Sequence, residues 1–269
     1  MVKKILSKAY VYIVLLLAYA PIIYLIVFSF TASKVQGVWA KPFTFELYVR
    51  LFKHKELMIA TRNTFLIAGV SAIISTILGT FGAIGIFYSN RKMRTVYEMV
   101  GQIPVMNPEI VIALSLLILF SVVNMETSFF TLLVGHIVLT VPFVVLSVTP
   151  KLKQMDPNIY EAALDLGAKP GFALRKVILP EIMPGIVSGF LLSVMLSLDD
   201  FIITAFTKPS SFDTISTFVY DRLMRSGAPI ELRALTTIIF VLTLGLLIAY
   251  NIRTNAKAKR NRSIVSRGA

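Results

Sequence analysis

Residues 156–180 read DPNIYEAALDLGAKPGFALRKVILP, a polar stretch between two apolar segments. Asp156 suits the N-cap of a short helix, and Pro157 suits its first position. Gly167 stands where the C-terminus of that helix favours a residue in the left-handed conformation, and Pro170 can begin a second helix. The stretch therefore predicts two short helices that meet at a glycine, a compact segment that we call the hook.

One face of the first helix of the hook is narrow and carries only small or apolar side chains. Its members recur at i, i+3, i+4 and i+7, the spacing of a single helix face: Ile159, Ala162, Ala163 and Leu166. Because alanine side chains are short, a partner surface can approach the backbone of this helix. The face is therefore a candidate contact for another protein.

The residue order in the hook is E-A-A, three residues, G, nine residues, x-x-L-P. The fixed positions are filled by Glu161, Ala162, Ala163, Gly167, Leu179 and Pro180, with Val177 where isoleucine is usual. This spacing resembles the cytoplasmic signature loop of the permease subunits of binding-protein-dependent ABC importers. The resemblance implies that the hook carries a coupling helix, which docks in a cleft of a separate ATPase subunit. The alternative is an ordinary amphipathic loop between two membrane helices.

The composition is that of an integral membrane protein. The chain has 269 residues, of which 56% are hydrophobic, and its mean hydropathy is +0.78. Six apolar segments have the length that crosses a bilayer: residues 10–30, 63–88, 96–122, 129–149, 182–206 and 234–252. We predict an all-α polytopic protein with six transmembrane helices, one permease domain over residues 1–269 with the hook inside it. The resemblance implies the type I ABC importer permease (MetI-like) fold.

The composition also disfavours several kinds of chemistry. There is no cysteine, and His54 and His136 lie far apart, so no thiol or metal site is expected. The net charge of +13 comes from basic residues scattered through short loops, which favours membrane topology over nucleic-acid binding. The glycine-rich run 79–85 has no lysine after it, so no cofactor is expected here and ATP is expected on a partner subunit. His136 is predicted to be a satisfied packing histidine, and Trp39 an interfacial anchor or packing residue.

The third apolar segment carries a carboxylate beside two prolines. Pro104 and Pro108 remove backbone donors, and lipid tolerates an opened helix only where the freed carbonyls face protein or a watery cavity. Glu109 follows directly, close to the middle of the segment. Insertion of a carboxylate at the centre of a membrane helix costs on the order of 2.5 to 3.5 kcal/mol, so a carboxylate at this position usually has a function. The third span is therefore predicted to be broken and to line a translocation path.

Asp199 and Asp200 stand side by side in the fifth apolar segment. Adjacent residues on a helix point about 100° apart, so only one of them can face a cavity fully unless the helix ends there. Together with Glu109 they form the candidate substrate path, and carboxylates suit a cargo that is an amine cation. The alternative is that both aspartates are hydrated at the outer end of the span or pair with arginines of a sister subunit.

The distribution of basic residues predicts the orientation in the membrane. If both termini are cytoplasmic, 17 of the 27 lysines and arginines lie inside, and the outer loops are residues 31–62 and 207–233. This orientation places the hook in the cytoplasm, where an ATPase would be. The basic tail, residues 253–267, is expected near anionic lipid. The expected location is the bacterial cytoplasmic membrane.

Four stretches resemble, within the family, the second permease subunit of spermidine/putrescine importers: PVMNPEIVIALSLLILF, LTVPFVVLSV, EAALDLGA and SLDDFIITAF. The resemblance implies a non-catalytic subunit that works with a sister permease, a dimer of ABC ATPase subunits and an extracytoplasmic polyamine-binding protein. One alternative is a permease of the same architecture for another solute, such as a phosphonate, ferric ion or thiamine. A second alternative is a secondary transporter, which would need neither an ATPase nor the hook.

Overall fold

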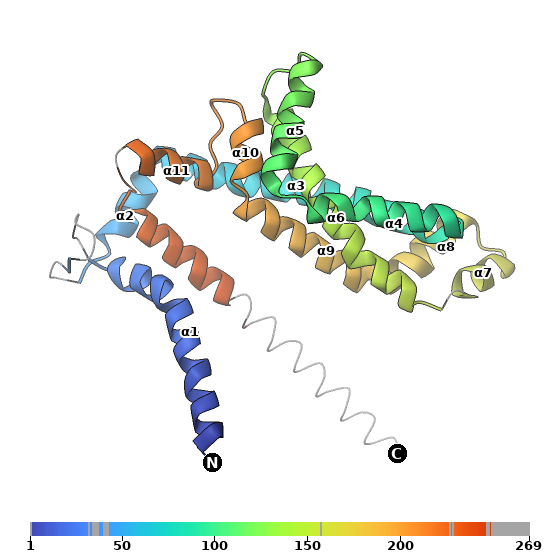
Figure 1. Ribbon diagram of the computed structural model, residues 1–269, viewed down its shortest axis with the longest axis horizontal. Helices are drawn as coiled ribbons and strands as arrows, with labels where there is room; N and C mark the ends of the chain where they lie inside the picture. The colour runs from blue at the N-terminus through green and yellow to red at the C-terminus, as the bar shows by residue number, and fades with distance from the viewer. Residues whose placement is uncertain are drawn as a thin grey trace. The chain divides into compact units, whose positions relative to one another are not determined.

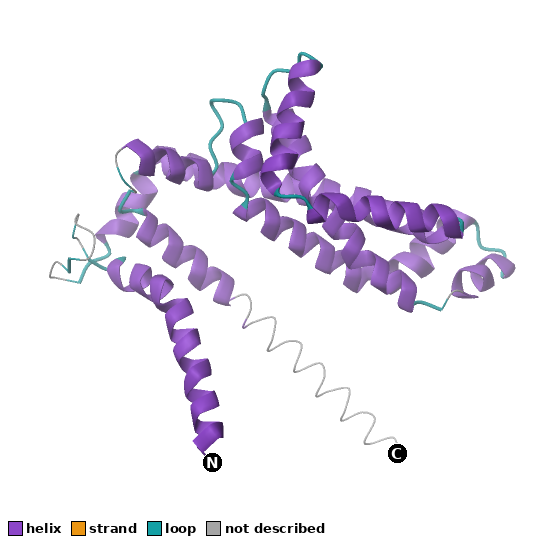
Figure 2. Ribbon diagram, in the orientation of Figure 1, coloured by secondary structure: helices purple, strands orange, loops and turns teal. Residues whose placement is uncertain are grey.

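The structure is a computed structural model that describes residues 2–31, 33, 38–39, 43–156, 158–225, 227, 229–245 and 248. These residues are almost entirely helical (Figures 1 and 2). The chain divides into two compact units, Met1–Met58 with Arg222–Ala269, and Ile59–Asp221. The helices are α1 Val2–Phe28, α2 Glu46–Lys53, α3 Lys55–Tyr88, α4 Arg91–Met106, α5 Glu109–Val122, α6 Phe129–Gln154, α7 Asn158–Asp165, α8 Pro170–Ala173, the π-helix η1 Leu174–Ile178, α9 Leu179–Asp199, α10 Ile202–Thr207 and α11 Ile215–Arg225.

Four helical segments among the described residues are long and apolar enough to cross a membrane: Tyr10–Phe28, Lys55–Tyr88, Phe129–Gln154 and Pro170–Asp199. α4 and α5 meet the same criteria together as a bent pair, which raises the number to five. The sixth predicted span, 234–252, overlaps the shorter apolar helix Leu232–Gly245, and most of its remaining residues lie outside the described ones, as does the basic tail. A polytopic helical membrane protein is therefore confirmed, whereas six spans are not.

The first unit contains α1 and the segment predicted as the first outer loop. Trp39 is half-exposed and packs edge-on against Phe28 of α1, with ring centroids 6.0 Å apart. The prediction of a loop over residues 31–62 is wrong in part, because α2 and the first turns of α3 lie within it. The second span begins at Lys55 rather than at residue 63, since Leu57 and Ala60 bury one face of those polar turns.

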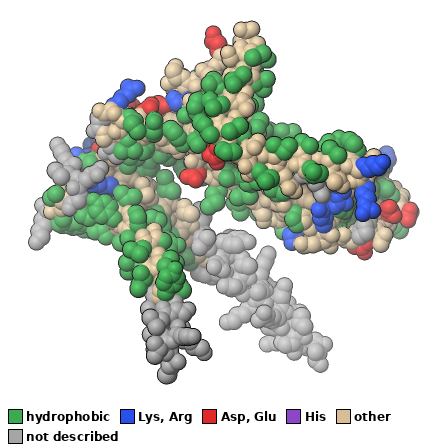
Figure 3. Space-filling model, viewed as in Figure 1, with side chains coloured by type: hydrophobic (Ala, Val, Ile, Leu, Met, Phe, Trp, Pro, Cys, Tyr) green, Lys and Arg blue, Asp and Glu red, His purple; other side chains and the backbone are tan. Residues whose placement is uncertain are grey.

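The second unit is built on α3, α6 and α9. α6 and α9 pack along each other, and their core joins Val144, Val148 and Leu152 of α6 to Ile182 of α9. Most of the surface around these helices is hydrophobic, whereas charged side chains gather at the end that carries α7 and α8 (Figure 3). An apolar surface of this kind suits lipid, and the charged end suits water.

Glycines allow the close approach of α3 to α6. A Cβ atom at Gly79 would lie 2.6 Å from Cβ of Val144, closer than real Cβ atoms come, whereas Gly69 and Gly85 face open space. Close helix packing at a small residue is therefore seen at Gly79, whereas Gly69 and Gly85 show no such contact.

Gly79→Ala is expected to destabilise the permease, and Gly85→Ala on the same helix is its matched control. Overpacking of a core costs about 1–3 kcal/mol, which exceeds the roughly 0.5–1 kcal/mol that alanine gains over glycine within a helix. Thermal unfolding of the purified protein in detergent should show a lower midpoint for Gly79→Ala and an unchanged or higher midpoint for Gly85→Ala. Equal midpoints for the two variants would refute the close packing at Gly79.

Two of the membrane segments are broken. α4 ends at Met106 and α5 begins at Glu109, with a bend of 101° between them. The predicted opening of the third span is confirmed at Pro108, and Pro104 remains inside α4. The fifth segment, predicted over 182–206, is also broken: α9 ends at Asp199 and the short α10 follows, which is the possibility left open for the two adjacent aspartates.

The hook also differs from the prediction at its second half. Pro170 does begin a helix, but that helix continues without interruption to Asp199, over 30 residues. The helix that carries the fifth span therefore starts at Pro170 rather than near 182, and Leu179 and Pro180 lie within this helix. Proline cannot donate to the carbonyl four residues before it, and its ring crowds that carbonyl. The wider π-helix Leu174–Ile178, which ends two residues before Pro180, contains this carbonyl and leaves more room for the ring.

Candidate functional site

The first helix of the hook, α7, is closed at both ends by specific contacts. The backbone N–H of Asn158 donates to Oδ1 of Asp156 at 2.9 Å, which makes Asp156 a cap, and Pro157 lies outside the described residues. Gly167 has φ +85°, as predicted. Its N–H donates to the Leu164 carbonyl at 2.8 Å, and the N–H of Ala168 donates to the Ala163 carbonyl at 3.1 Å. This pair of bonds is a Schellman motif, which fixes the direction in which the chain leaves α7.

One face of the hook exposes apolar side chains to solvent. Leu166 is 89% exposed and Phe172 is 59% exposed. Glu161 and Ala162 are exposed, while Ala163 is half-buried. These exposed apolar side chains lie at the charged end of the molecule.

Other side chains of the hook pack against the transmembrane helices. The ring of Tyr160 on α7 packs against that of Tyr88 at the end of α3, with centroids 5.3 Å apart. Tyr160 and Leu179 also pack on the core formed by α3, α6 and α9, while Pro180 is exposed. The hook is therefore joined to α3 and α9 by packed side chains.

The structure brings together the three acids of the candidate substrate path. Glu109 is the first residue of α5 and is exposed, and Asp199 is the last residue of α9 and is also exposed. Asp200 is buried, with 5% of its surface exposed. Ile112 of α5 and Ile203 of α10 lie in one buried cluster, so the breaks in the two spans lie near each other.

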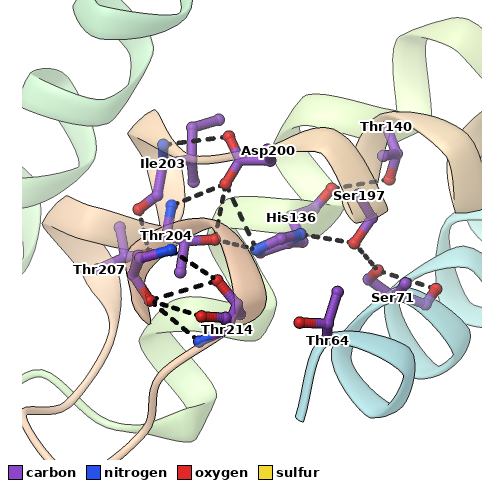
Figure 4. A network of polar contacts seen from close by, with 12 residues as sticks. Thr64, Ser71, His136, Thr140, Ser197, Asp200, Ile203, Thr204, Thr207 and Thr214 are labelled. Carbon is purple, nitrogen blue, oxygen red and sulfur yellow. Dashed lines mark hydrogen bonds and ion pairs between the residues drawn. The ribbon is translucent and has the colours of Figure 1, made fainter. Parts of the chain in front are cut away.

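Asp200 differs from Asp199 because both oxygens of its carboxylate accept hydrogen bonds (Figure 4). Oδ1 accepts from the backbone N–H of Ile203 at 3.1 Å. Oδ2 accepts from the backbone N–H of Thr204 at 2.8 Å and from its hydroxyl at 2.7 Å. These bonds hold the first turn of α10. Asp199 and Asp200 thus point to different surroundings because the helix ends between them.

A buried polar network joins Asp200 to three other helices (Figure 4). His136 on α6 is fully buried, with Nε2 3.0 Å from Oγ1 of Thr204 and 3.7 Å from Oδ2 of Asp200, and Nδ1 2.7 Å from Oγ of Ser197 on α9. Ser71 of α3 continues the chain to Ser197 at 3.3 Å. The prediction of a satisfied packing histidine is confirmed. The bonds of His136 hold α9 and α10 to α6.

Sequence reasoning missed the hydroxyl members of this network. A signal was present, because polar residues recur one helical turn apart inside apolar segments. The pairs in the network are Ser71 and Ser75, His136 and Thr140, and Asp200 and Thr204. Among the described residues, no group of three or more His, Asp or Glu side chains is arranged to hold a metal ion.

Residues 75–260 match a protein family described as "Binding-protein-dependent transport system inner membrane component". The chain belongs to this family. It is a permease, the membrane component of a binding-protein-dependent ABC transporter, rather than a catalytic subunit, and it resides in the inner membrane with several spans.

Full-length relatives support this assignment. The permease is 33% identical to the spermidine/putrescine transport system permease protein PotC of Escherichia coli K12 over 261 residues, 97% of this chain and 98% of that protein. It is 36% identical to PotC of Haemophilus influenzae over 244 residues, 90% and 94% of the two chains. A chain in the crystal structure of a bacterial ABC transporter that imports the acidic polysaccharide alginate has the same fold. The TM-score is 0.69 at 16% identity, over 94% of this chain and 96% of that one.

Proposed function

We propose that this permease and a sister permease together form the path by which an ATP-driven importer carries spermidine or putrescine into a bacterial cell. The observation that carries the proposal is the similarity, over nearly the whole chain, to permeases of spermidine/putrescine transport systems. An extracytoplasmic polyamine-binding protein delivers the cargo. A dimer of ABC ATPase subunits binds ATP, and the permease holds no cofactor of its own.

The acids at the two breaks support a cationic cargo. Glu109 and Asp199 expose their carboxylates, and both belong to helix ends rather than to helix interiors. A polyamine loses hydrogen bonds to water when it enters the membrane. A carboxylate compensates for part of this loss by accepting a charge-assisted hydrogen bond from the ammonium group. We assign Glu109 and Asp199 to contact with the cargo, and Asp200 to the shape of the path, because its oxygens already accept three hydrogen bonds.

The hook supports coupling to the ATPase. We propose that its exposed face docks in the ATPase cleft, with the signature positions Glu161, Ala162, Ala163, Gly167, Leu179 and Pro180 shaping the docked loop. Closure of the ATPase dimer then draws the hooks of the two permeases together. Because the hook packs on α3 and α9, this movement turns the path from inward-open to outward-open, and hydrolysis resets it.

The proposal is tested by purifying the permease with its co-expressed ATPase and sister subunits and measuring ATP hydrolysis in liposomes. We expect the binding protein loaded with spermidine or putrescine to stimulate hydrolysis. Binding protein offered thiamine, ferric ion or a phosphonate should not. Stimulation by one of these other solutes alone would assign the permease to a different cargo, and a permease that never associates with an ATPase would overturn the importer assignment.

The orientation is tested with two single cysteines in a chain that has none. Lys169 and Ser210 are both exposed, the first in the hook and the second in the turn before α11. A cysteine at Ser210 is expected to react with a membrane-impermeant maleimide in intact cells, and a cysteine at Lys169 only after the membrane is opened. Labelling at position 169 from outside would reverse the topology and remove the hook from the ATPase.

A further inference from the structure

The break between α9 and α10 is held by side chains rather than by proline or glycine. The residues across it are Asp199, Asp200, Phe201 and Ile202. Asp200 caps the first turn of α10, and Ile203 within that turn is fully buried. The position of α10 therefore depends on what holds Asp200 and Ile203.

Ile203 is the fully buried residue of α10 in the cluster that joins α10 to α5. It packs in one cluster with Ile112 and Leu116 of α5 and Leu139 of α6. The fit on the α6 side is tight, because a Cβ atom at Gly135 would lie 2.7 Å from Cγ2 of Ile203. Since α5 begins at Glu109, the placement of α10 also sets where Glu109 stands relative to the end of α9.

The hydrogen bonds of the network fix one nitrogen of His136 as the donor. The hydroxyl of Thr204 has a single proton, and it donates that proton to Oδ2 of Asp200, because a carboxylate only accepts. Oγ1 of Thr204 must then accept from Nε2–H of His136 at 3.0 Å. On the other side of the ring, Nδ1 meets Ser197 of α9 at 2.7 Å. The imidazole thus connects α9 to α10 through Thr204 on one side and Ser197 on the other (Figure 4).

We propose that His136 is a positioning residue for transport: by bonding Thr204 and Ser197 it holds Asp200 and α10 in place, and so sets the spacing of Asp199 and Glu109. This inference rests on the proposed function, in which those two acids meet the cargo. His136 acts through Thr204 and Ser197 and does not itself touch the substrate. A misplacement of about 1 Å at a reacting or binding group can cost up to about a hundredfold in rate.

The test compares His136→Leu with His136→Gln in the complete transporter reconstituted in liposomes. Leucine fills similar volume without a donor, whereas glutamine can present an amide N–H to Thr204. We measure spermidine uptake and binding-protein-stimulated ATP hydrolysis in the same vesicles. His136→Leu is expected to lower uptake per ATP hydrolysed by at least about tenfold, and His136→Gln to restore most of it. If His136 had a purely structural role, both variants would lose uptake and ATP hydrolysis in the same proportion. Uptake per ATP hydrolysed would then stay at the wild-type value in both variants, and that result would overturn the proposal.

A second readout does not depend on the cargo. A cysteine at Asp199 is the only thiol in the chain, and its reaction rate with a cationic methanethiosulfonate reagent reports the exposure and surroundings of that position. We expect His136→Leu to change this rate severalfold and His136→Gln to leave it near that of the parent. An unchanged rate in His136→Leu refutes the positioning role. A changed rate, together with no polyamine uptake by the wild-type transporter in which Asp199 is intact, would instead uphold the positioning role and refute the proposed cargo.

Discussion

Replacing Gly167 with valine is expected to abolish polyamine uptake while the permease still inserts and assembles. Gly167 has φ +85° and closes the Schellman motif that ends α7. A β-branched residue in this conformation costs on the order of 1–3 kcal/mol of backbone strain, which shifts the hook away from its docking conformation by about 5- to 150-fold. Because the hook is the proposed link to the ATPase, the loss appears as uncoupling rather than as unfolding.

Gly171→Ala is the matched control for Gly167→Val. Gly171 lies four residues further along the hook, has no positive φ and has open space around its Cα. The measurements are the amount of permease in the membrane fraction, spermidine uptake, and ATP hydrolysis with and without loaded binding protein. Gly171→Ala should behave as wild type. Wild-type uptake by Gly167→Val would show that the hook geometry is not needed for coupling.

The second large effect is expected from removing charge at the candidate substrate path. Glu109→Gln and Asp199→Asn keep the shape of each side chain and remove its charge. The loss of one charged hydrogen-bond partner should cost on the order of 1.5–3 kcal/mol during passage of the cargo, or roughly tenfold to more than a hundredfold in uptake rate. Both acids are exposed at helix ends, so neither change should disturb packing.

Asp200→Asn is expected to behave differently from these two variants. Its carboxylate is buried and accepts three hydrogen bonds, so the change should lower the stability of the α9–α10 break as well as uptake. Glu126→Gln, at an exposed acid in the turn before α6, serves as the control and should transport at the wild-type rate. If Glu109→Gln and Asp199→Asn also transport at the wild-type rate, the electrostatic argument for a polycation is wrong.

Features set by local chemistry could be predicted from the sequence. The left-handed Gly167, the helix start at Pro170 and the break at Pro108 all follow from glycine or proline. Each of these residues restricts the backbone by itself, whatever packs around it. They are also the features that the structure places where the sequence predicted them.

Features set by tertiary contacts could not be predicted. SLDDFIITAF contains no proline or glycine, and its hydropathy suggests an unbroken helix. The break after Asp199 exists because Asp200 caps α10 and Ile203 packs against Gly135, a residue 68 positions earlier. The place of His136 in the network was hidden for the same reason, since its hydrogen-bond partners outside α6 come from α9 and α10. Hydropathy also did not show that the helix of the fifth span extends back to Pro170, because the π-helix before Pro180 belongs to a polar segment.

The most direct test of the account is the accumulation of labelled spermidine in vesicles that contain the complete transporter. Accumulation is predicted to require both ATP on the side of the hook and binding protein on the opposite side. In the double variant Glu109→Gln/Asp199→Asn it should fall at least about tenfold while stimulated ATP hydrolysis continues. Accumulation without ATP or binding protein, or equal accumulation by the wild type and the double variant, would contradict the account.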